Sequence, residues 1–328
     1  MEAIRRKAVP YRMVLMVLMA AASTALWAQA PGEVGPPRPP AAQEPKLPAP
    51  FDQATLSALA QKTWRPTPLT VAGLVEDSVA FIIESVRYPS ENFMTSGLLA
   101  TPKTGKPPYP AVVICHGFYP PDKYFQGLGT LDTIEALASE GFVVLMPDYR
   151  GYPPSEGQHT YPHPGEIADV AQGVVSLAMH PKVNAKRIGI IGYSMGGGYA
   201  LQAAEILGDK VKVFVDYYGQ LGGFFFRDDE LGMLLEQGID MPTAEAIWKS
   251  RSPLHHLYRL KSTTLIFHGQ NDRTVSITQS LMLRNDLQRL GKPVELVTFP
   301  EYGHAFGDSF HNKSYPLLVK FLKAQLAK

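Results

Sequence analysis

The chain has 328 residues, 45% of them hydrophobic, which is enough apolar side chain to fill the core of one large domain. Its formal net charge at pH 7 is +1, so the composition does not indicate nucleic acid or another polyanion as a partner. Cys115 is the single cysteine, which excludes an intramolecular disulfide, and we expect it to be a small core residue.

The first 28 residues have the pattern of a secretory signal peptide. Basic residues at 5–7 precede an apolar, uncharged run over 13–28 that ends in small residues. This order predicts export to the periplasm or the medium, with cleavage of the leader and no stable membrane span afterwards. An uncleaved anchor is the alternative, and the cleavage site is open between Ala28 and Ala30.

Residues 29–50 contain eight prolines and few side chains that could pack, which predicts a semi-rigid, extended linker. It is open whether this linker is a spacer from a membrane or wall, or a disordered segment without a role. The folded domain is expected over residues 51–328, beginning with a short helix near 51–62.

From residue 78 onward, short apolar runs alternate with segments of helical periodicity, which is typical of an α/β domain with a mostly parallel sheet flanked by helices. Eight strands are expected, at 79–87, 94–100, 111–115, 142–147, 188–193, 212–217, 263–268 and 294–299. Helices are expected near 129–140, 165–180, 195–207, 276–290 and 314–327.

Residues 218–262 form a longer insertion between the sixth and seventh expected strands. Ligands of open α/β sheets bind beyond the carboxyl ends of the strands, so we expect this insertion to be a small lid over that edge. Phe224, Phe225 and Phe226 follow a pair of glycines and are candidates for ligand contact. The alternative, that these rings pack the insertion onto the domain, is equally open.

The expected strand at 188–193 runs into Gly192-Tyr193-Ser194-Met195-Gly196, and a helical segment follows. A Gly-x-Ser-x-Gly turn between a strand and a helix is the nucleophile elbow of the α/β-hydrolase fold, which presents a serine hydroxyl above the sheet. The turn is too tight for side chains at the two glycines. Ser194 is therefore the candidate nucleophile, and an α/β-hydrolase fold is expected.

A serine nucleophile needs a general base and an acid that orients the base, and in this fold they follow in the order Ser, Asp, His. Asp272 follows the strand expected at 263–268, and His304 lies in the loop after the strand expected at 294–299. We therefore expect Asp272 to hold the tautomer of His304, and His304 to act first as general base and then as general acid.

Other acids and histidines compete with these assignments. Asp216, at the end of the sixth expected strand, is the main alternative acid. Asp148 and Asp169 also lie near strand ends, and Asp148 is expected to order its loop through Arg150. His116 is expected to be structural. The remaining competitors are expected to be solvated or core histidines: His255, His256, His268 and His311.

A tetrahedral oxyanion is usually stabilised by two backbone N–H donors. The residue after the nucleophile supplies one, which is Met195 here. The third expected strand ends in Cys-His-Gly-Phe-Tyr at 115–119, and the residue after His-Gly, Phe118, is expected to supply the other. Tyr119 is an alternative donor, and Tyr119 and Tyr193 are candidates for substrate contact.

The sequence has no His-Glu-x-x-His, no paired cysteines and no carboxylate cluster at metal-ligand spacing. The glycines at 196–198 follow the serine without the spacing of a phosphate-binding loop. We therefore expect no metal, no cofactor and no nucleic acid partner, and a small ester or a short peptide as substrate. The oligomeric state is not indicated.

Over residues 105–328 the chain resembles the catalytic domain of the prolyl oligopeptidase family of serine peptidases, within the α/β-hydrolase superfamily. The resemblance rests on Asp148-Tyr149-Arg150-Gly151, Gly192 to Gly197, Ser252-Pro253-Leu254, His268 to Val275, and Leu290 to Val294. It implies a Ser-Asp-His hydrolase, without separating peptidases from esterases or from dienelactone-hydrolase-like enzymes. Phe118 departs from the pattern, because many members have a second glycine there.

Peptidases of this family usually carry a β-propeller that selects oligopeptides, and residues 29–104 are too few for its blades. An open site with a small aromatic lid favours esters of modest size. We therefore expect an exported serine hydrolase that cleaves carboxylic esters through an acyl-enzyme. The alternatives are a peptidase or amidase, a lactone- or thioester-opening enzyme, and a binding module without catalysis.

Overall fold

In the computed structural model, the described residues are 47, 52, 55–159, 164–222, 227–304 and 307–327. The predicted signal peptide and nearly all of the predicted linker lie outside them, so the boundaries at residues 28 and 50 stay predictions. Phe224, Phe225 and Phe226 also lie outside the described residues, as does the side chain of His311. All described residues belong to one unit, Arg38–Lys328.

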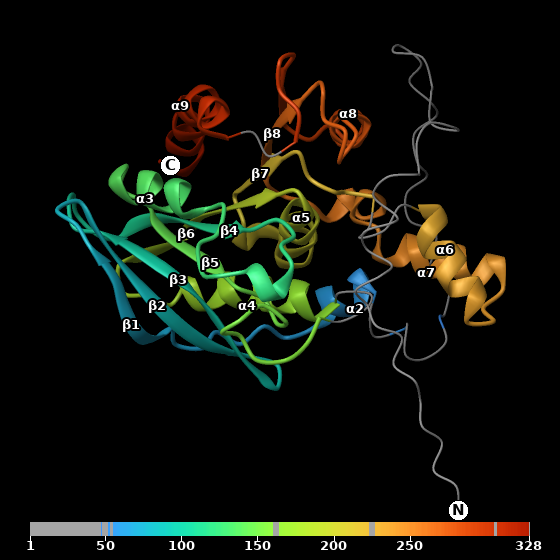
Figure 1. Cartoon of the computed structure of the whole chain (residues 1–328), viewed down its shortest axis with the longest axis horizontal. Helices are drawn as coiled ribbons and strands as arrows, with labels where there is room; N and C mark the ends of the chain where they lie inside the picture. Colours follow the sequence, from blue (N-terminus) through green and yellow to red (C-terminus); the bar gives the residue numbers. More distant parts are fainter. Residues whose placement is uncertain are drawn as a thin grey trace, which may run out of the picture. The chain divides into compact units, whose positions relative to one another are not determined.

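The described part of the chain is built on a nine-stranded sheet in the order β1-β2-β3-β5-β4-β6-β7-β8-β9 (Figure 1). The strands are β1 Thr70–Asp77, β2 Phe81–Ser90, β3 Phe93–Pro102, β4 Tyr109–Cys115, β5 Val143–Pro147, β6 Val183–Tyr193, β7 Val213–Tyr217, β8 Thr263–Gly269 and β9 Val294–Phe299. Strands β4 to β9 are parallel, and β1, β2 and β3 add antiparallel pairings at one edge. The fold class is therefore the predicted one, an α/β fold with a large, mostly parallel sheet.

The sheet has one strand more than the eight predicted, because the prediction omits β1. This strand pairs with β2 at the outer edge of the sheet, with two register shifts. Val71, Leu74 and Val75 on β1 are each more than half exposed. Because this edge strand has no buried face, its sequence does not alternate between apolar and polar residues. The period-two pattern from which strands are predicted is therefore missing.

Helices cover both faces of the sheet. Their bounds are α2 Leu56–Gln61, α3 Leu131–Ser139, α4 Pro164–Leu177, α5 Met195–Leu207, α6 Arg227–Glu236, α7 Met241–Arg251, α8 Thr278–Arg289 and α9 Gly307–Leu326. Side chains of α2, α4, α5 and α8 belong to one buried cluster, and those of α3 and α9 belong to another. None of the described helices is long and apolar enough to cross a lipid bilayer.

Strand β4 shows how the sheet divides the core into these two clusters. Val113 and Cys115 belong to the first cluster, whereas Val112 and Ile114 belong to the second, as the alternation of a strand requires. All four are fully buried, and burial of each aliphatic side chain contributes about 1.5–3 kcal/mol. Burial also raises the pKa of the Cys115 thiol, so this residue is a core cysteine as predicted.

The five predicted helices are present as α3, α4, α5, α8 and α9, although α9 begins at Gly307 instead of 314. The predicted insertion between β7 and β8 contains α6 and α7. They pack on each other through a separate small cluster that includes Leu231, Leu234, Ala244 and Ile247. The role of this insertion as a lid stays a prediction.

Candidate active site

Ser194 lies on the turn between β6 and α5 with a φ of +53°, a value that residues other than glycine rarely adopt. A Cβ at Gly192 would overlap the carbonyl oxygen of Gly196, and a Cβ at Gly196 would overlap that of Cys115. The Ser194 N–H donates to the carbonyl of Tyr217 at 3.0 Å, which ties the turn to β7. Neighbouring backbone atoms therefore leave no room for a side chain at either glycine of the motif. The backbone strain lies at Ser194, the residue that presents the hydroxyl.

One imidazole joins the hydroxyl of Ser194 to a carboxylate. Nε2 of His304 lies 2.9 Å from Ser194 Oγ, and Nδ1 of His304 lies 2.7 Å from Asp272 Oδ2. The Asp272 side chain is fully buried, whereas 16% of the His304 side chain is exposed. The structure therefore brings together the three predicted residues, from the loops after β6, β8 and β9.

The Asp272 carboxylate is held on both oxygens. Its Oδ1 accepts hydrogen bonds from the N–H groups of Thr274 and Val275, each at 2.8 Å. Its Oδ2 lies 2.7 Å from His304 Nδ1 and 3.3 Å from His268 Nε2. Burial acts to raise the pKa of Asp272, but the hydrogen bonds from His268, His304 and Val275 outweigh it and hold that pKa below its ordinary value. The carboxylate is therefore ionised at neutral pH.

Asp216, the alternative acid, packs against the first turn of α5. Its Oδ2 accepts the Gly219 N–H at 3.2 Å, and its Oδ1 has no hydrogen-bond partner among the described residues. A Cβ at Gly197 would come within 2.5 Å of that Oδ1. Burial raises the pKa of Asp216 to about 7, against opposing effects of His268 and the Gly219 hydrogen bond. Asp272, and not Asp216, occupies the position beside His304.

Asp148 orders its loop, but not through the predicted partner. Its donors are the side chains of Ser96, Tyr124 and Gln126, at 2.7, 2.5 and 2.6 Å. Arg150 instead donates to Asp169 of α4, at 2.6 and 3.0 Å. The predicted Asp148–Arg150 pair is wrong, because Asp169 offers the guanidinium two carboxylate oxygens in the bidentate geometry that arginine favours.

The loop after β4 lies against the nucleophile, since a Cβ at Gly117 would be 3.4 Å from the Cβ of Ser194. His116 is buried behind this loop, and its Nδ1–H donates to the Gly117 carbonyl at 2.7 Å. Its ring stacks between Tyr124 and Tyr149, with centroid distances of 4.8 and 4.3 Å. Burial lowers the pKa of His116 to about 3, so the ring is neutral and structural, as predicted.

Each of the two predicted oxyanion donors is next in the chain to a residue of the site. Met195 follows Ser194 as the first residue of α5, and Phe118 follows Gly117 in the adjoining loop. Phe118 and Tyr119 are both partly exposed. The Tyr119 N–H lies 3.4 Å from the Tyr152 hydroxyl. The donor roles of Met195 and Phe118, and the substrate contact of Tyr119, stay predictions.

Tyr193 does not lie where a substrate contact requires. Its ring is buried and stacks on Tyr217 with the centroids 4.7 Å apart. Its hydroxyl lies 3.1 Å from Thr133 Oγ1 of α3, within the cluster on the α3 face. The structure therefore contradicts the predicted substrate contact of Tyr193, because strand alternation directs this side chain into the core.

Tyr218 is a site residue that the sequence analysis misses. It follows β7 with a φ of +43°, which is unusual for a bulky side chain. Its ring meets the imidazole of His304 edge to face, with the centroids 4.7 Å apart. Its position directly after the end of a strand next to β6 is the sequence feature that could have identified it.

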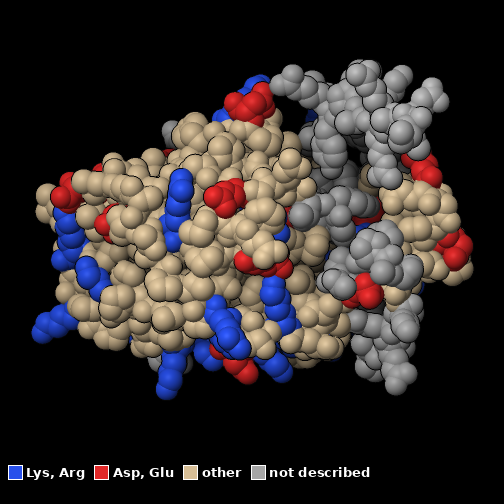
Figure 2. Space-filling model, turned by 90° about the horizontal axis from the view of Figure 1, so that it is seen from below, with Lys and Arg blue, Asp and Glu red and all other residues tan. Residues whose placement is uncertain are grey.

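Charged side chains form no dominant patch on the face drawn in Figure 2, where Lys and Arg stand among uncharged residues with Asp and Glu between them. Within the described ranges, no group of three or more His, Cys, Asp or Glu side chains is arranged to hold a metal ion.

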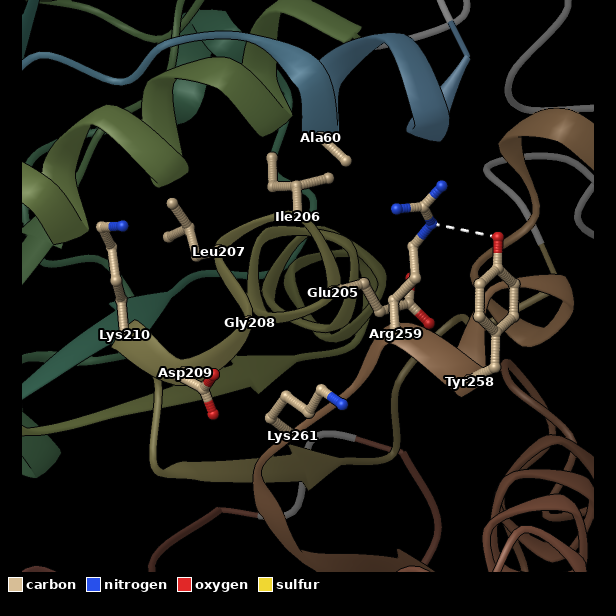
Figure 3. A pocket seen from close by; sticks show the side chains of 10 residues that line it. All are labelled: Ala60, Glu205, Ile206, Leu207, Gly208, Asp209, Lys210, Tyr258, Arg259 and Lys261. Atoms are coloured by element: carbon tan, nitrogen blue, oxygen red, sulfur yellow. Dashed lines mark hydrogen bonds between the residues drawn. The ribbon is translucent and has the colours of Figure 1, made fainter.

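A hollow of about 510 Å³ lies at the last turn of α5, around Glu205, Lys210 and Arg259 (Figure 3). Ser194 precedes the first turn of the same helix, whose 13 residues span about 20 Å. Both carboxyl oxygens of Glu205 are buried without a hydrogen-bond partner among the described residues, and burial raises the pKa of Glu205. Because the length of α5 lies between them, this hollow is separate from the site around Ser194.

The chain belongs to the prolyl oligopeptidase family, whose model matches residues 130–328. Uncharacterized peptidase YtmA of Bacillus subtilis (strain 168) is 28% identical, over 57% of this chain and 74% of that protein. Uncharacterized peptidase YuxL of the same organism is 27% identical, over 72% of this chain but only 37% of that protein.

The α/β-hydrolase fold is also that of Acetyl Xylan Esterase 1 from Thermoanaerobacterium sp. JW/SL YS485. The two structures share 16% identity and a TM-score of 0.63, over 84% of this chain and 94% of that chain. Likeness at this identity shows the fold alone. Family and fold together make the chain a serine hydrolase of the esterase or peptidase type.

Proposed function

We propose that this chain hydrolyses carboxylic esters through an acyl-enzyme formed on Ser194. The observation that carries the proposal is the hydrogen-bonded line from Ser194 Oγ through His304 to Asp272, with distances of 2.9 and 2.7 Å. A serine hydroxyl is a weak nucleophile by itself, and a base within hydrogen-bond reach activates it. His304 is that base in this proposal.

In acylation, Ser194 Oγ attacks the ester carbonyl carbon while His304 Nε2 takes the hydroxyl proton. Asp272 stays ionised, keeps the proton on Nδ1 and stabilises the imidazolium. The tetrahedral intermediate then expels the alcohol, which takes the proton from Nε2. In deacylation a water molecule repeats these steps on the acyl-enzyme, which releases the carboxylic acid and restores Ser194.

The negative charge that develops on the carbonyl oxygen needs fixed donors. We assign this role to the N–H groups of Met195, which follows Ser194 in the chain, and Phe118, which follows Gly117 in the loop that lies against Ser194. Met195 also begins α5, so the partial positive charge of the helix N-terminus adds to the stabilisation. Loss of one such donor typically costs about 10²–10³ in kcat.

The N-terminal part of the domain favours esters over oligopeptides. Described residues 55–104 form α2 and strands β1–β3, which extend the same sheet. A propeller that selects oligopeptides, usual among peptidases of the family, has no counterpart within those residues. The structural match covers 94% of the chain of the acetyl xylan esterase, which supports the esterase proposal.

A peptidase is the second candidate, because the family model and the printed names of YtmA and YuxL refer to peptidases. The test is kcat/KM for p-nitrophenyl acetate, butyrate and octanoate beside prolyl and aminoacyl arylamides. The ester proposal predicts that the best ester exceeds the best arylamide by more than about tenfold. If kcat/KM for the best arylamide lies within that factor of kcat/KM for the best ester, the peptidase proposal replaces the esterase proposal.

We also propose that the enzyme is exported. Support comes from the basic residues at 5–7 and the apolar run at 13–28. Expression of the full chain in a Gram-negative host, followed by N-terminal sequencing of the periplasmic fraction, tests this proposal. Export predicts a new N-terminus near Ala28 or Ala30, whereas an intact Met1 in the cytosolic fraction would contradict it.

A further inference from the structure

His268 is a buried imidazole next to the candidate triad with partners on both ring nitrogens. It is the last residue but one of β8 and is fully buried. Its Nε2 lies 3.0 Å from the carbonyl oxygen of Val275 and 3.3 Å from Oδ2 of Asp272. Its Nδ1 lies 2.7 Å from Ser280 Oγ, at the start of α8.

These contacts determine where the imidazole carries its proton. The carbonyl of Val275 can only accept, and the Asp272 carboxylate, ionised at neutral pH, also accepts. Nε2 must therefore be protonated and donate toward both oxygens. In the neutral ring Nδ1 is then an acceptor, and the Ser280 hydroxyl donates to it.

The same carboxylate oxygen also binds His304. Oδ2 of Asp272 thus faces two imidazoles, His304 at 2.7 Å and His268 at 3.3 Å. The backbone donors at Thr274 and Val275 fix only Oδ1. The fully buried His268 is therefore a second imidazole beside Oδ2, in addition to the partly exposed His304.

We propose that His268 is a positioning residue for the reaction, whose Nε2–H aims Oδ2 of Asp272 at His304 while Ser280 fixes the tautomer of His268. It acts through Asp272 and does not touch the substrate. The inference rests on the proposed roles of Ser194, His304 and Asp272, but it does not depend on whether the substrate is an ester or a peptide.

Removal of the donor has a predictable effect on proton transfer. The charge of Asp272 is then shared with one imidazole instead of two, so the imidazolium of His304 is stabilised more strongly. The carboxylate also loses a fixed orientation. Besides Asp272, the titratable group that interacts with His268 is Asp216 on β7, whose pKa His268 lowers. Both replacements of His268 remove this effect, so the comparison between the two variants is not altered by it. The acid limb of the rate profile is therefore expected to move to higher pH.

The test compares His268→Met with His268→Gln, because the two side chains have similar length and only glutamine offers an N–H donor. The measurement is the rate at which a fluorophosphonate labels Ser194 between pH 5 and 9, which reports activation of the hydroxyl without reference to the natural substrate. We expect labelling of His268→Met to fall about ten- to hundredfold at pH 7, with an acid limb displaced upward. We expect His268→Gln to recover to within about threefold of the wild type.

Equal rates for the two variants, or wild-type labelling by His268→Met, would overturn the proposal. Should His268→Met fail to fold by its melting curve, Ser280→Ala replaces it, with exposed Ser276→Ala as control. Ser280→Ala is expected to slow labelling about threefold or more, and a rate equal to that of Ser276→Ala would overturn the proposal. A wild type that is labelled but turns over no ester would refute the proposed function and leave this inference intact.

Discussion

A hydrogen bond of 2.7 Å joins Oδ2 of Asp272, in the loop after β8, to Nδ1 of His304, in the loop after β9. The two strands are parallel neighbours, so their carboxyl ends hold both loops at one edge of the sheet. An ionised carboxylate can only accept, so Nδ1 carries the proton and Nε2 is free to accept from Ser194. The tautomer needed for catalysis is thus a consequence of strand order.

Asp272→Asn is expected to lower kcat by about 10⁴, because the amide can donate to Nδ1 and stabilise the wrong tautomer of His304. Steady-state kinetics with one p-nitrophenyl ester measures the loss. Asp216→Asn is the control, on the neighbouring strand β7, and should stay within about threefold of the wild type. If kcat fell strongly in Asp216→Asn and only slightly in Asp272→Asn, the acid that orients His304 would be Asp216 on β7.

The raised pKa of Asp216, about 7, predicts a pH-dependent stability. Between pH 4 and 7 the unfolded chain has released the proton of this carboxyl, whereas the folded chain still binds it. The contribution of this carboxyl to the free energy of unfolding is therefore fully present at about pH 4 and is lost as pH rises toward 7. Asp216→Asn lacks this titration.

Melting temperatures of the wild type and Asp216→Asn, measured from pH 4 to 8, test that sign. As pH rises from 4 to 7, the melting temperature of the variant should increase relative to that of the wild type. Above pH 7 the difference between the two melting temperatures should stay constant. A difference that does not change with pH, or that changes in the opposite direction, would contradict the raised pKa.

Tyr218→Ala should lower kcat by about tenfold, because the edge-to-face contact that restricts the His304 ring is lost. Tyr218→Phe keeps the ring and should retain most of the activity. The comparison uses kcat and KM for one ester, with circular dichroism to verify the fold. Equal kcat values in the two variants would show that the ring does not orient His304.

Gly196→Ala should destabilise the domain by more than about 3 kcal/mol, since its Cβ would overlap the backbone oxygens of Cys115 and His116. Gly232→Ala is the matched control, in α6, where an added Cβ meets nothing within 4 Å. That change should be neutral or stabilise by up to about 1 kcal/mol. Denaturant unfolding of both variants provides the comparison, and a Gly196→Ala protein as stable as the control would refute the steric argument.

Local sequence predicts much of this fold, because buried strands and helices carry strong periodic patterns. Strands β4, β5, β7 and β8 and the second half of β6 are buried on both faces and appear as apolar runs. The elbow motif identifies the turn at Ser194. Chain order then places Asp272 and His304 after neighbouring strands. These are features of single segments, which a sequence displays directly.

The remaining features depend on contacts between segments. The prediction omits the exposed edge strand β1, assigns Asp148 to Arg150, and treats Tyr193 as a substrate contact although it packs against α3. Tyr218 and His268 acquire their places beside His304 and Asp272 only when β7, β8 and α8 pack together. No pattern in a single segment specifies such pairings.

The proposed function requires that the hydroxyl of Ser194 carries the acyl group during ester hydrolysis. Its most direct test is acid quenching of the enzyme during turnover of p-nitrophenyl butyrate, followed by mass spectrometry of its peptides, in the wild type and in Ser194→Ala. We expect a butyryl group on the peptide that contains Ser194, and loss of both the adduct and nearly all turnover in the variant. A Ser194→Ala enzyme that keeps more than about a tenth of wild-type turnover, or an acyl group on another residue, would contradict it.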